Sequence, residues 1–324
     1  MKYVRIHGPR DIRVEEVQIP TIGSDDILVR VKACGICGSD IHRYVGDRFG
    51  LRLAPYPLNS GHEYCGDVVD VGVNVSKFKV GDRVTLGLNW VTDGNGAFAE
   101  YIRIPRADDR PILKVPSQVS YEEAAQIEPL TVAINGFHAA RPLRGDKVLI
   151  LGAGPIGLSV LQCCRIEQVG EIIVSEVSKR RLQVARQLGA AVVNPSEENL
   201  EEKVKAITGG RGVDVTFECA GSSVTAEQAI ALTRRGGRIV LIAHYGAGAR
   251  LDAEEIVSRN LILYGLMGST SYFPDPEKEA LKLILEGKVE LRPLISHEFP
   301  LEEVREAFET AANPNISVKV LIKP

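Results

Sequence analysis

The segment from residue 147 to residue 157 constrains the fold of this chain most. A short apolar run at 148–151 is followed by a turn with three glycines, Gly152, Gly154 and Gly157. The apolar residues that come next continue at helical spacing. A strand, a tight glycine turn and a helix in this order let a pyrophosphate approach the backbone at the helix N-terminus. We therefore expect a dinucleotide-binding turn here, with a plain structural turn as the alternative.

A second strand supports this interpretation. Residues 171–176 read Glu-Ile-Ile-Val-Ser-Glu, and Glu176 comes 19 residues after Gly157. An acid at this spacing is where a carboxylate binds the cofactor ribose. It accepts hydrogen bonds from the 2′-hydroxyl and repels a 2′-phosphate, so Glu176 favours NAD over NADP. The basic residues at 179–181 could soften that preference, but they are also what the solvated first turn of a helix contains.

Composition excludes several classes of function. The chain has 324 residues, enough for about two domains, and 44% of them are hydrophobic. A net charge of −3 gives no basic footprint for nucleic acid. The N-terminus is charged at once and shows no signal peptide, and no apolar run is long enough to span a membrane. Six cysteines in a chain of this length are not typical of a disulfide framework. We expect a cytoplasmic protein with reduced thiols.

The chain divides into two parts with different sequence patterns. Residues 1–125 read as short β-elements broken by Gly, Pro and Asp, which predicts a mostly antiparallel β domain. From about residue 128, strands and helices alternate, which predicts an α/β fold with a doubly wound parallel sheet that binds ligands at its carboxyl edge. The six expected strands are residues 147–151, 171–176, 190–193, 213–218, 237–243 and 261–265. Beyond about residue 268, two helices and a last strand are expected to return to the first domain.

Possible metal ligands gather in the first part of the chain. Residues 34–42 read Cys-Gly-Ile-Cys-Gly-Ser-Asp-Ile-His, residues 61–63 read Gly-His-Glu, and Glu128 lies at the expected domain junction. Zinc accepts thiolate, imidazole and carboxylate, and a catalytic zinc site keeps one position open. Any one of these residues alone is more simply a core cysteine or a loop histidine. Together, and beside a dinucleotide fold, they favour a catalytic zinc site.

The sequence resembles the zinc-dependent medium-chain dehydrogenase/reductase family, in particular its polyol (sorbitol-type) and threonine/butanediol dehydrogenase branch. The match covers nearly the whole chain in family order. The motifs that carry it are CGICGSDIH (34–42), GHEYCGDVVDVG (61–72), KFKVGDRV (77–84), GAFAEY (96–101), EPLTVAINGFHAA (128–140) and GAGPIG (152–157). The resemblance implies a GroES-like catalytic domain at 1–128, completed by 268–324, and a Rossmann NAD-binding domain at 129–267. It also implies an active site in the cleft between them.

The resemblance assigns the zinc ligands. Cys37 and His62 match the catalytic zinc ligands of the family. Glu63 matches a carboxylate that binds the metal in polyol-type members, and Glu128 occupies a position that reaches the metal directly or through water. We list both acids and rank Glu63 slightly first. Cys34 matches a motif position that is usually not a ligand, and a fourth protein ligand would close the site to substrate.

The resemblance also implies a reaction, the reversible oxidation of a secondary alcohol to a ketone. The bound metal supplies a Lewis acid, and the nicotinamide accepts hydride. Ser39 matches the hydroxyl that hydrogen-bonds the substrate alcohol, and His42 matches the outlet for the proton by way of the cofactor ribose. Taken alone, Ser39 could be a turn residue and His42 a surface histidine. Asp40 is expected to orient the loop or a ligand.

The chain departs from the family pattern after residue 84. Many zinc members carry four closely spaced cysteines there that bind a structural zinc, whereas residues 81–98 of this chain contain no cysteine. We therefore expect one catalytic Zn²⁺ per chain. Because that lobe often lies near subunit contacts, its loss weakens any inference about how subunits assemble. The resemblance implies a homo-oligomer, a dimer or a tetramer.

The expected cofactor contacts lie at the ends of the parallel strands and at one basic position in the C-terminal segment. They are Gly152, Gly154, Pro155, Ile156, Gly157, Glu176, Arg181, Cys219, Ala220, Ala243, His244, Leu266, Met267 and Lys319. The resemblance puts Lys319 near the pyrophosphate.

The substrate is expected to be a small alcohol, with neither nucleic acid nor a membrane as a partner. A polyol or sugar alcohol is the first choice, and threonine or 2,3-butanediol comes next. Tyr44, Arg48 and Phe49 are candidates for the wall of the substrate site, although exposed loop residues are the simpler interpretation. Two other classes stay open: a zinc-free quinone or enoyl reductase on the same fold, and a nucleotide-binding protein without turnover.

Overall fold

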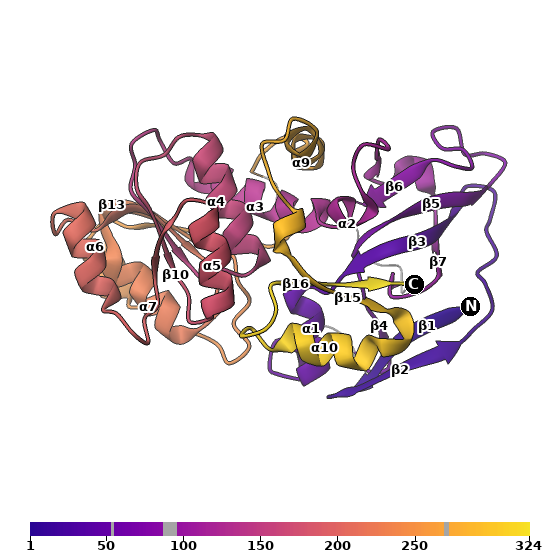
Figure 1. Cartoon of the computed structure of the whole chain (residues 1–324), viewed down its shortest axis with the longest axis horizontal. Helices are drawn as coiled ribbons and strands as arrows, with labels where there is room; N and C mark the ends of the chain where they lie inside the picture. Colours follow the sequence, from indigo (N-terminus) through magenta and orange to yellow (C-terminus); the bar gives the residue numbers. More distant parts are fainter. Residues whose placement is uncertain (53–54, 87–95, 269–271) are drawn as a thin grey trace. The chain divides into compact units, whose positions relative to one another are not determined.

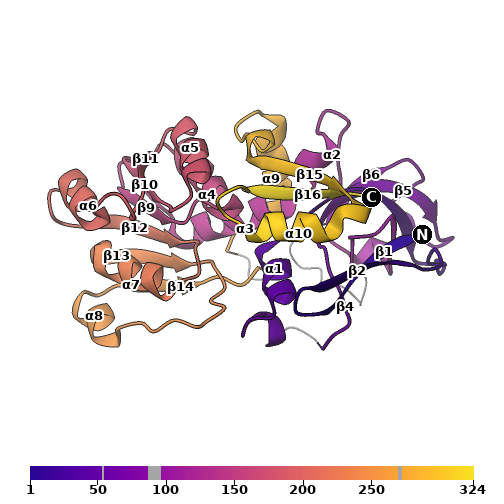
Figure 2. The same cartoon turned by 60° about the horizontal axis from the view of Figure 1, so that its bottom comes forward.

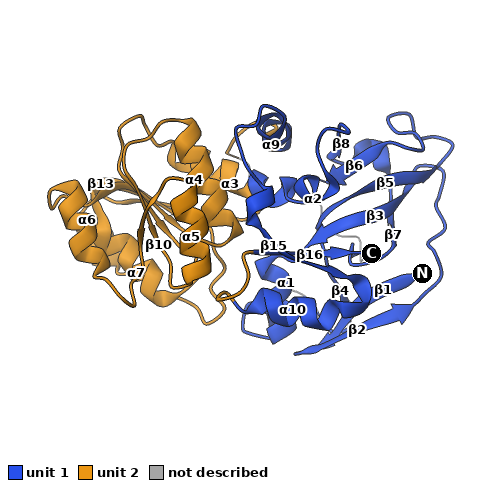
Figure 3. Cartoon of the chain, in the orientation of Figure 1, with its two compact units in different colours: residues 1–131, 277–313, 319–324 blue, residues 132–276, 314–318 orange. Residues whose placement is uncertain are grey.

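The computed structural model describes residues 1–324 except 53–54, 87–95 and 269–271. The chain forms two compact units (Figures 1 and 3). Unit 1 contains Met1–Thr131, Glu277–Asn313 and Lys319–Pro324, and unit 2 contains Val132–Pro276 and Pro314–Val318. Helix α3 (Ile127–Ala140) runs through the first of these boundaries, at Thr131, three residues beyond the expected position 128. The second boundary, at Pro276, lies nine residues beyond the expected position 267.

Unit 1 is built on β-sheet. A seven-stranded sheet has the order β15-β16-β3-β5-β6-β8, with β7 also paired to β3, and a three-stranded sheet has the order β2-β1-β4. All pairs are antiparallel except β15 with β16. The expected mostly antiparallel domain is confirmed. The strands are β1 (Lys2–Gly8), β2 (Asp11–Glu16), β3 (Ile27–Gly35), β4 (Leu58–Asn59), β5 (Glu63–Val71), β6 (Arg83–Leu86), β7 (Tyr101–Ile104), β8 (Ile112–Lys114), β15 (Ile295–Pro300) and β16 (Lys319–Lys323).

Three neighbouring strands of this sheet position the site described below. Gly35, at the end of β3, pairs with Glu63 at the start of β5 and with Leu321 of β16. Because paired residues lie side by side across a sheet, the C-terminal strand reaches the same place as two segments from the first quarter of the chain. The sheet thereby joins residues that are far apart in sequence.

The helices of unit 1 lie between or beside these strands. They are α1 (Gly38–Val45), α2 (Tyr121–Ala124), α9 (Pro276–Leu285), whose first residue belongs to unit 2, and α10 (Val304–Ala312), with 3-10 turns at Gly50–Arg52, Ala107–Asp109, Arg292–Leu294 and Leu301–Glu303. Helix α10 packs on β15 and β16 (Figure 2). Phe308 of α10 and Tyr44 of α1 meet edge to face in the apolar core of this unit.

Unit 2 is a six-stranded, wholly parallel sheet in the order β11-β10-β9-β12-β13-β14. The strands are β9 (Val148–Leu151), β10 (Ile172–Ser175), β11 (Ala191–Val193), β12 (Val213–Glu218), β13 (Thr233–Leu241) and β14 (Ile262–Gly265). The helices that alternate with them are α4 (Pro155–Ile166), α5 (Lys179–Gln187), α6 (Leu200–Thr208), α7 (Ser223–Leu232) and α8 (Ala253–Ser258). All six predicted strands are present, and the doubly wound α/β fold is confirmed.

The adjacent strands β9 and β10 are near-continuous apolar runs because both of their faces are covered. All four residues of β9 are buried, and so are all four of β10. Among the described residues, none of the helices combines the length and the apolar character needed to cross a membrane.

Candidate active site

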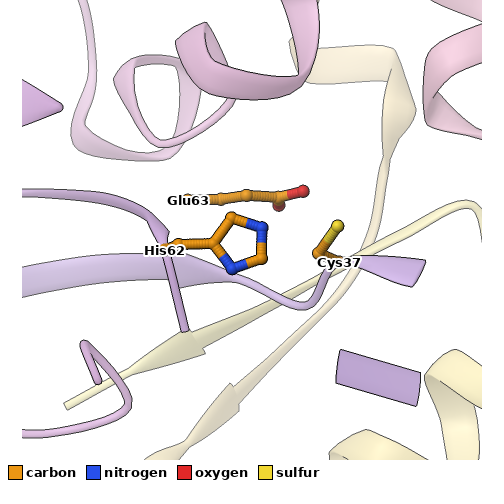
Figure 4. A group of neighbouring side chains, drawn as sticks. All are labelled: Cys37, His62 and Glu63. Carbon is orange, nitrogen blue, oxygen red and sulfur yellow. The ribbon is translucent and has the colours of Figure 1, made fainter. Parts of the chain in front are cut away.

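Three side chains with metal-binding atoms converge in unit 1. One ligand atom each from Cys37, His62 and Glu63 lies within 4.8 Å of the others, and Figure 4 shows the three side chains directed toward one another. Cys37 is the residue just before α1, and His62 and Glu63 stand where the chain enters β5. A thiolate, an imidazole and a carboxylate are donors that zinc prefers, and three protein ligands leave a fourth position open. The donor set fits a catalytic zinc ion.

Asp40 holds the backbone of one of these ligands, Cys37, and places its charge near a second, His62. Its side chain is fully buried on α1, and its Oδ2 accepts a 2.9 Å hydrogen bond from the backbone N–H of Cys37. Its Oδ1 accepts the hydroxyl hydrogen of Ser60 and lies 3.9 Å from Nδ1 of His62. A carboxylate that accepts a hydrogen bond from a ligand segment fixes that segment in place, and Asp40 accepts such a bond from the backbone of Cys37. This agrees with the orienting role expected for Asp40.

His62 sits in a strongly negative environment. Burial by itself lowers the pKa of His62, but the neighbouring Cys37, Asp40 and Glu128 outweigh that effect and hold the pKa well above its ordinary value. The cluster of Cys37, His62 and Glu63 therefore attracts positive charge. A divalent cation would supply that charge in place of a proton on the ring.

Lys319 provides a positive charge beside the Glu63 carboxylate. Its Nζ donates a hydrogen bond to the Glu63 carboxylate and another, of 3.1 Å, to the carbonyl of Ile36. Both charged side chains are 2% exposed. Burial lowers the pKa of Lys319, and the negative charges of Glu63 and Cys37 more than reverse that effect. In the structure its ammonium is buried in unit 1 against a candidate zinc ligand, and the expected contact of Lys319 with the pyrophosphate stays a prediction.

Gly35 makes room for the Glu63 carboxylate. A Cβ atom at position 35 would lie 2.2 Å from Oε2 of Glu63, far inside van der Waals contact. Because β3 and β5 pair at these two residues, the space cannot be recovered without moving the carboxylate. Glycine at this position is what lets Glu63 turn toward Cys37 and Lys319.

Glu128 lies in the first turn of α3 and outside the group of three. Burial raises the pKa of Glu128 to about 7, the nearby positive charge of His62 opposes the rise, and Glu63 adds to it. Its field in turn raises the pKa of His62. Glu128 therefore acts on the site through its charge. Glu63 is the acid that supplies a ligand atom to the cluster of three.

Ser39 and His42 both lie on α1 (Gly38–Val45), whose N-cap is Cys37. One helix therefore carries a candidate zinc ligand and both candidate proton-transfer groups. Nδ1 of His42 hydrogen-bonds the Asp47 carboxylate, a partner that the sequence analysis did not single out.

The expected substrate wall needs one correction. Tyr44 is completely buried, and its hydroxyl donates a 2.6 Å hydrogen bond to Glu309 of α10. It is a core residue that joins two helices and cannot face a substrate. Arg48 is exposed, and Phe49 packs edge-on against the ring of His42 with 5.3 Å between ring centroids.

Unit 2 carries the glycine turn. It follows β9 directly, with Gly152 at φ +96°, a backbone conformation that favours glycine. Gly154 is the N-cap of α4, which starts at Pro155, so Ile156 and Gly157 lie in its first turn. A pyrophosphate over this turn meets backbone N–H groups and the positive end of the helix.

Glu176 lies beside this turn, as the strand–turn–helix interpretation predicts. One carboxylate oxygen accepts the N–H of Ala153 at 2.9 Å, and the other accepts the N–H groups of Val177 at 2.8 Å and Ser178 at 3.0 Å. The bonds hold the acid in one orientation against the glycine turn. A ribose 2′-hydroxyl can donate to an acid placed in this way.

Arg181 is the nearest described cation to this acid. Its NH1 is 3.8 Å from Glu176, and its Nε donates a 2.9 Å hydrogen bond to the carbonyl of Ser317. Burial lowers the pKa of Arg181, and Glu176 works against that effect. This hydrogen bond holds the Arg181 side chain against the backbone of the segment that returns to unit 1.

The other expected cofactor contacts lie at the carboxyl edge of the sheet, where ligands bind in open α/β sheets. Cys219 and Ala220 follow β12, Ala243 and His244 follow β13, and Leu266 and Met267 follow β14. Of these side chains, Met267 is 53% exposed and Leu266 is buried.

Glu218 organises this edge, and the sequence analysis did not identify it. The residue is fully buried. Its Oε1 accepts the N–H groups of Ala220 and Gly221, both at 2.9 Å, and its Oε2 accepts the hydroxyl hydrogen of Tyr245 at 2.6 Å. The acid ties the loop after β12 to the loop after β13. The available signal in the sequence was an acid at the end of a predicted strand, directly before the expected contacts Cys219 and Ala220.

Comparison with known proteins agrees with the two sites. The family model described as "Alcohol dehydrogenase GroES-like domain" matches residues 23–117, and the one described as "Zinc-binding dehydrogenase" matches residues 155–286. These two ranges contain the three-residue cluster and the glycine-turn helix respectively.

Relatives match over their whole length. (R,R)-Butanediol dehydrogenase of Bacillus subtilis (strain 168) is 33% identical over 100% of both chains. Sorbitol dehydrogenase of the same strain is 32% identical over 100% of this chain and 97% of its own. The structure of a candidate zinc-binding dehydrogenase from Sinorhizobium meliloti 1021 bound to NADP is 30% identical, with a TM-score of 0.85 over 100% of this chain and 99% of that one.

A donor set that fits zinc, a glycine turn that fits a dinucleotide, and similarity along the entire chain lead to one conclusion. The chain belongs to the family of zinc-binding alcohol dehydrogenases and is an oxidoreductase that uses zinc and a nicotinamide dinucleotide, NAD or NADP.

Proposed function

We propose that this enzyme reversibly oxidises the secondary hydroxyl of a polyol or sugar alcohol to a ketone, with NAD as the hydride acceptor. The observation that carries the proposal is the convergence of Cys37, His62 and Glu63 in a chain that also has Glu176 beside its glycine turn. The ligand set uses a carboxylate in addition to the thiolate and imidazole, and leaves one coordination position for substrate.

The metal, when bound, supplies a Lewis acid, and the nicotinamide supplies the hydride acceptor. The protein's own residues do the rest. Cys37, His62 and Glu63 hold the metal, and Asp40 fixes the backbone of Cys37. The Ser39 hydroxyl accepts the proton of the substrate alcohol, and His42 takes it on toward solvent. Glu128 adds a buried negative charge near His62 and keeps the site attractive to cations.

The preference for NAD rests on Glu176. Its carboxylate is oriented by three backbone N–H groups, so it can accept bonds from a 2′-hydroxyl and repels a 2′-phosphate. Arg181, 3.8 Å away, offers a phosphate some compensation. The NADP-bound relative from S. meliloti makes NADP the control cofactor in every assay.

The substrate class follows from the relatives and from the charge of the site. Sorbitol dehydrogenase and (R,R)-butanediol dehydrogenase of B. subtilis are 32% and 33% identical to this chain. Two acids near the metal position suit a polyhydroxylated substrate, because each extra hydroxyl can donate to a carboxylate. 2,3-Butanediol and threonine are the alternatives.

We also propose that the enzyme works in the cytoplasm as a homodimer or homotetramer. All six cysteines are free, which fits a reducing compartment. Light scattering of the purified protein measures the oligomeric state, and a monomeric mass would contradict that part of the proposal.

The function is tested by following NADH formation with zinc-loaded enzyme across a panel of sorbitol, xylitol, galactitol, 2,3-butanediol and threonine, each with NAD and NADP. The proposal predicts the highest kcat/KM for a polyol with NAD. A best rate with butanediol or threonine would select the alternative substrates. Reduction of a quinone or enone by the metal-free protein, without alcohol oxidation, would favour a zinc-free reductase. Cofactor binding without any turnover would make the protein a binding module.

A further inference from the structure

Asp47 bridges the backbone of its own loop and the ring of His42. It lies between α1 and the 3-10 turn at Gly50–Arg52. Its Oδ1 accepts the backbone N–H groups of Phe49 at 3.0 Å and Gly50 at 2.9 Å, and its Oδ2 is hydrogen-bonded to Nδ1 of His42. The two oxygens of one carboxylate therefore have separate partners.

The His42 ring is held on a second side. The edge of Phe49 packs against it, with 5.3 Å between ring centroids and an interplanar angle of 77°. Partial burial raises the pKa of the Asp47 carboxyl, but the hydrogen bonds from Gly50, His42 and Phe49 outweigh burial and leave that pKa lowered. Asp47 is therefore an ionised carboxylate at neutral and alkaline pH.

An ionised carboxylate only accepts hydrogen bonds. Nδ1 of His42 must therefore carry the hydrogen that points at Asp47, and in the neutral ring the lone pair is then on Nε2. We propose that Asp47 is a positioning residue for proton transfer, which fixes the His42 tautomer so that Nε2 accepts the proton released by the substrate alcohol. This inference rests on the proposed role of His42 in the alcohol dehydrogenase reaction.

The proton balance of the step is complete. Oxidation of a secondary alcohol breaks its C–H and O–H bonds: the hydride goes to the nicotinamide, and the O–H proton leaves through the relay to Nε2 of His42. The ring becomes an imidazolium that faces the Asp47 carboxylate through its Nδ1–H, and it then gives the Nε2 proton to solvent. No further oxidant or reductant is needed.

The separate partners of the two Asp47 carboxylate oxygens make a sharp substitution available. In Asp47→Asn, the amide oxygen is needed by the N–H groups of Phe49 and Gly50, which can only donate. The amide NH₂ then faces His42, so Nδ1 must become the acceptor and the hydrogen moves to Nε2. The variant keeps the loop but reverses the tautomer. In another catalytic Asp–His pair, the wrong tautomer costs orders of magnitude in rate.

A matched control exists elsewhere in unit 1. The carboxylate of Asp108 also accepts two backbone N–H groups, those of Ser76 at 2.9 Å and Lys77 at 3.1 Å. Ser76 and not a histidine supplies the third hydrogen bond to that carboxylate. Asp108→Asn thus makes the same chemical change at an Asp that caps a loop through Ser76 and Lys77.

The experiment is nitrogen-15 NMR of the zinc-loaded enzyme with labelled histidine, at alkaline pH, together with steady-state kinetics. The chain has six histidines, and His42 is assigned by the signals lost in His42→Gln. The proposal predicts the Nδ1–H tautomer in the wild type and the Nε2–H tautomer in Asp47→Asn. It also predicts a fall in kcat of about tenfold to 10²-fold, with KM for NAD unchanged. Asp108→Asn should change neither the tautomer nor kcat.

Two results would overturn the inference: an Nε2–H tautomer in the wild type, or an unchanged tautomer in folded Asp47→Asn. The first needs no variant, so the inference remains testable even if Asp47→Asn fails to fold. Full turnover of His42→Gln would instead remove His42 from the proposed reaction, whatever the tautomer is. Failure of the inference and failure of the proposed function are thereby distinguished.

Discussion

The ammonium of Lys319 is hydrogen-bonded to the carboxylate of Glu63, and both side chains are 2% exposed. The pair joins the last strand of the chain to a candidate zinc ligand. A buried carboxylate needs a compensating charge, and in the metal-free protein Lys319 provides it. A zinc ion bound by Glu63 provides a second one, so the two cations compete for the same acid.

Lys319→Met should therefore affect the metal-free and zinc-loaded proteins differently. We expect the metal-free protein to lose about 3 kcal/mol of unfolding free energy, because one partner of a buried pair is left unpaired. The zinc-loaded protein should lose less, and zinc should bind more tightly. Urea denaturation with and without a chelator measures the unfolding free energies, and zinc titration against an indicator measures the zinc affinity.

Lys323→Met is the control. Lys323 pairs with Glu122 and Glu298, but its side chain is 41% exposed, and exposed pairs contribute under about 1 kcal/mol. Equal losses with and without zinc would contradict the competition.

Gly35→Ala should displace the Glu63 carboxylate, because the added Cβ lies 2.2 Å from Oε2. Overpacking of this kind costs about 1–3 kcal/mol, and we expect weaker zinc binding in addition. Thermal unfolding and zinc titration are the measurements. Gly8→Ala in β1 adds a Cβ with no heavy atom within 4 Å and should be near neutral. Unaltered zinc affinity in Gly35→Ala would show that the Glu63 carboxylate is not confined as described.

Glu128 gives the metal-free protein a pH dependence with a definite sign. Burial raises the pKa of Glu128 from 4.5 to about 7 in the folded state, so folding favours the protonated carboxyl. That stabilisation is present below about pH 4.5 and is lost as the pH rises through about 7, by roughly 3 kcal/mol in total. Glu128→Gln removes it. The wild type minus variant difference in unfolding free energy, measured by urea denaturation with chelator at pH 5 and pH 8, should become more unfavourable to the wild type at pH 8. A difference independent of pH would contradict the raised pKa.

Glu176→Ser should weaken the preference for NAD. Loss of hydrogen bonds to a charged acceptor costs about 1.5–3 kcal/mol, and repulsion of a 2′-phosphate disappears at the same time. The ratio of kcat/KM with NAD to kcat/KM with NADP should fall by about tenfold to 10²-fold. Glu197→Ser is the control, since Glu197 is exposed and pairs with Lys179 at the surface. An unchanged ratio in Glu176→Ser would mean that a group other than Glu176 distinguishes the 2′-hydroxyl of NAD from the 2′-phosphate of NADP.

Local pattern predicted much of this molecule. The apolar run at 148–151, the glycine turn and the acid at 176 are separated by short, regular intervals, so the strand–turn–helix and its neighbouring strand could be predicted from sequence alone. Cys37, His62 and Glu63 belong to compact motifs, and the structure brings their ligand atoms together.

Contacts between residues far apart in the sequence could not be predicted from local pattern. Lys319 approaches Glu63 because β16 pairs with β3 and β3 with β5, a register that no local pattern reveals. Tyr44 looked like an exposed loop aromatic because its partner, Glu309, comes 265 residues later. Asp47 and Glu218 act through loop geometry, which determines where each carboxylate oxygen points.

The central claim is that one zinc ion, held by Cys37, His62 and Glu63, makes this protein an alcohol dehydrogenase. Residues 87–95, where the structural-zinc lobe of other members begins, lie outside the described residues, so the expectation of one zinc per chain remains a prediction. The most direct test titrates chelated enzyme with Zn²⁺ while NADH formation from a polyol is followed. We predict that activity rises linearly and saturates at one Zn²⁺ per chain, and that Cys37→Ala binds NAD but shows no zinc-dependent activity. Full activity without zinc, saturation at two ions per chain, or retained turnover in Cys37→Ala would contradict the claim.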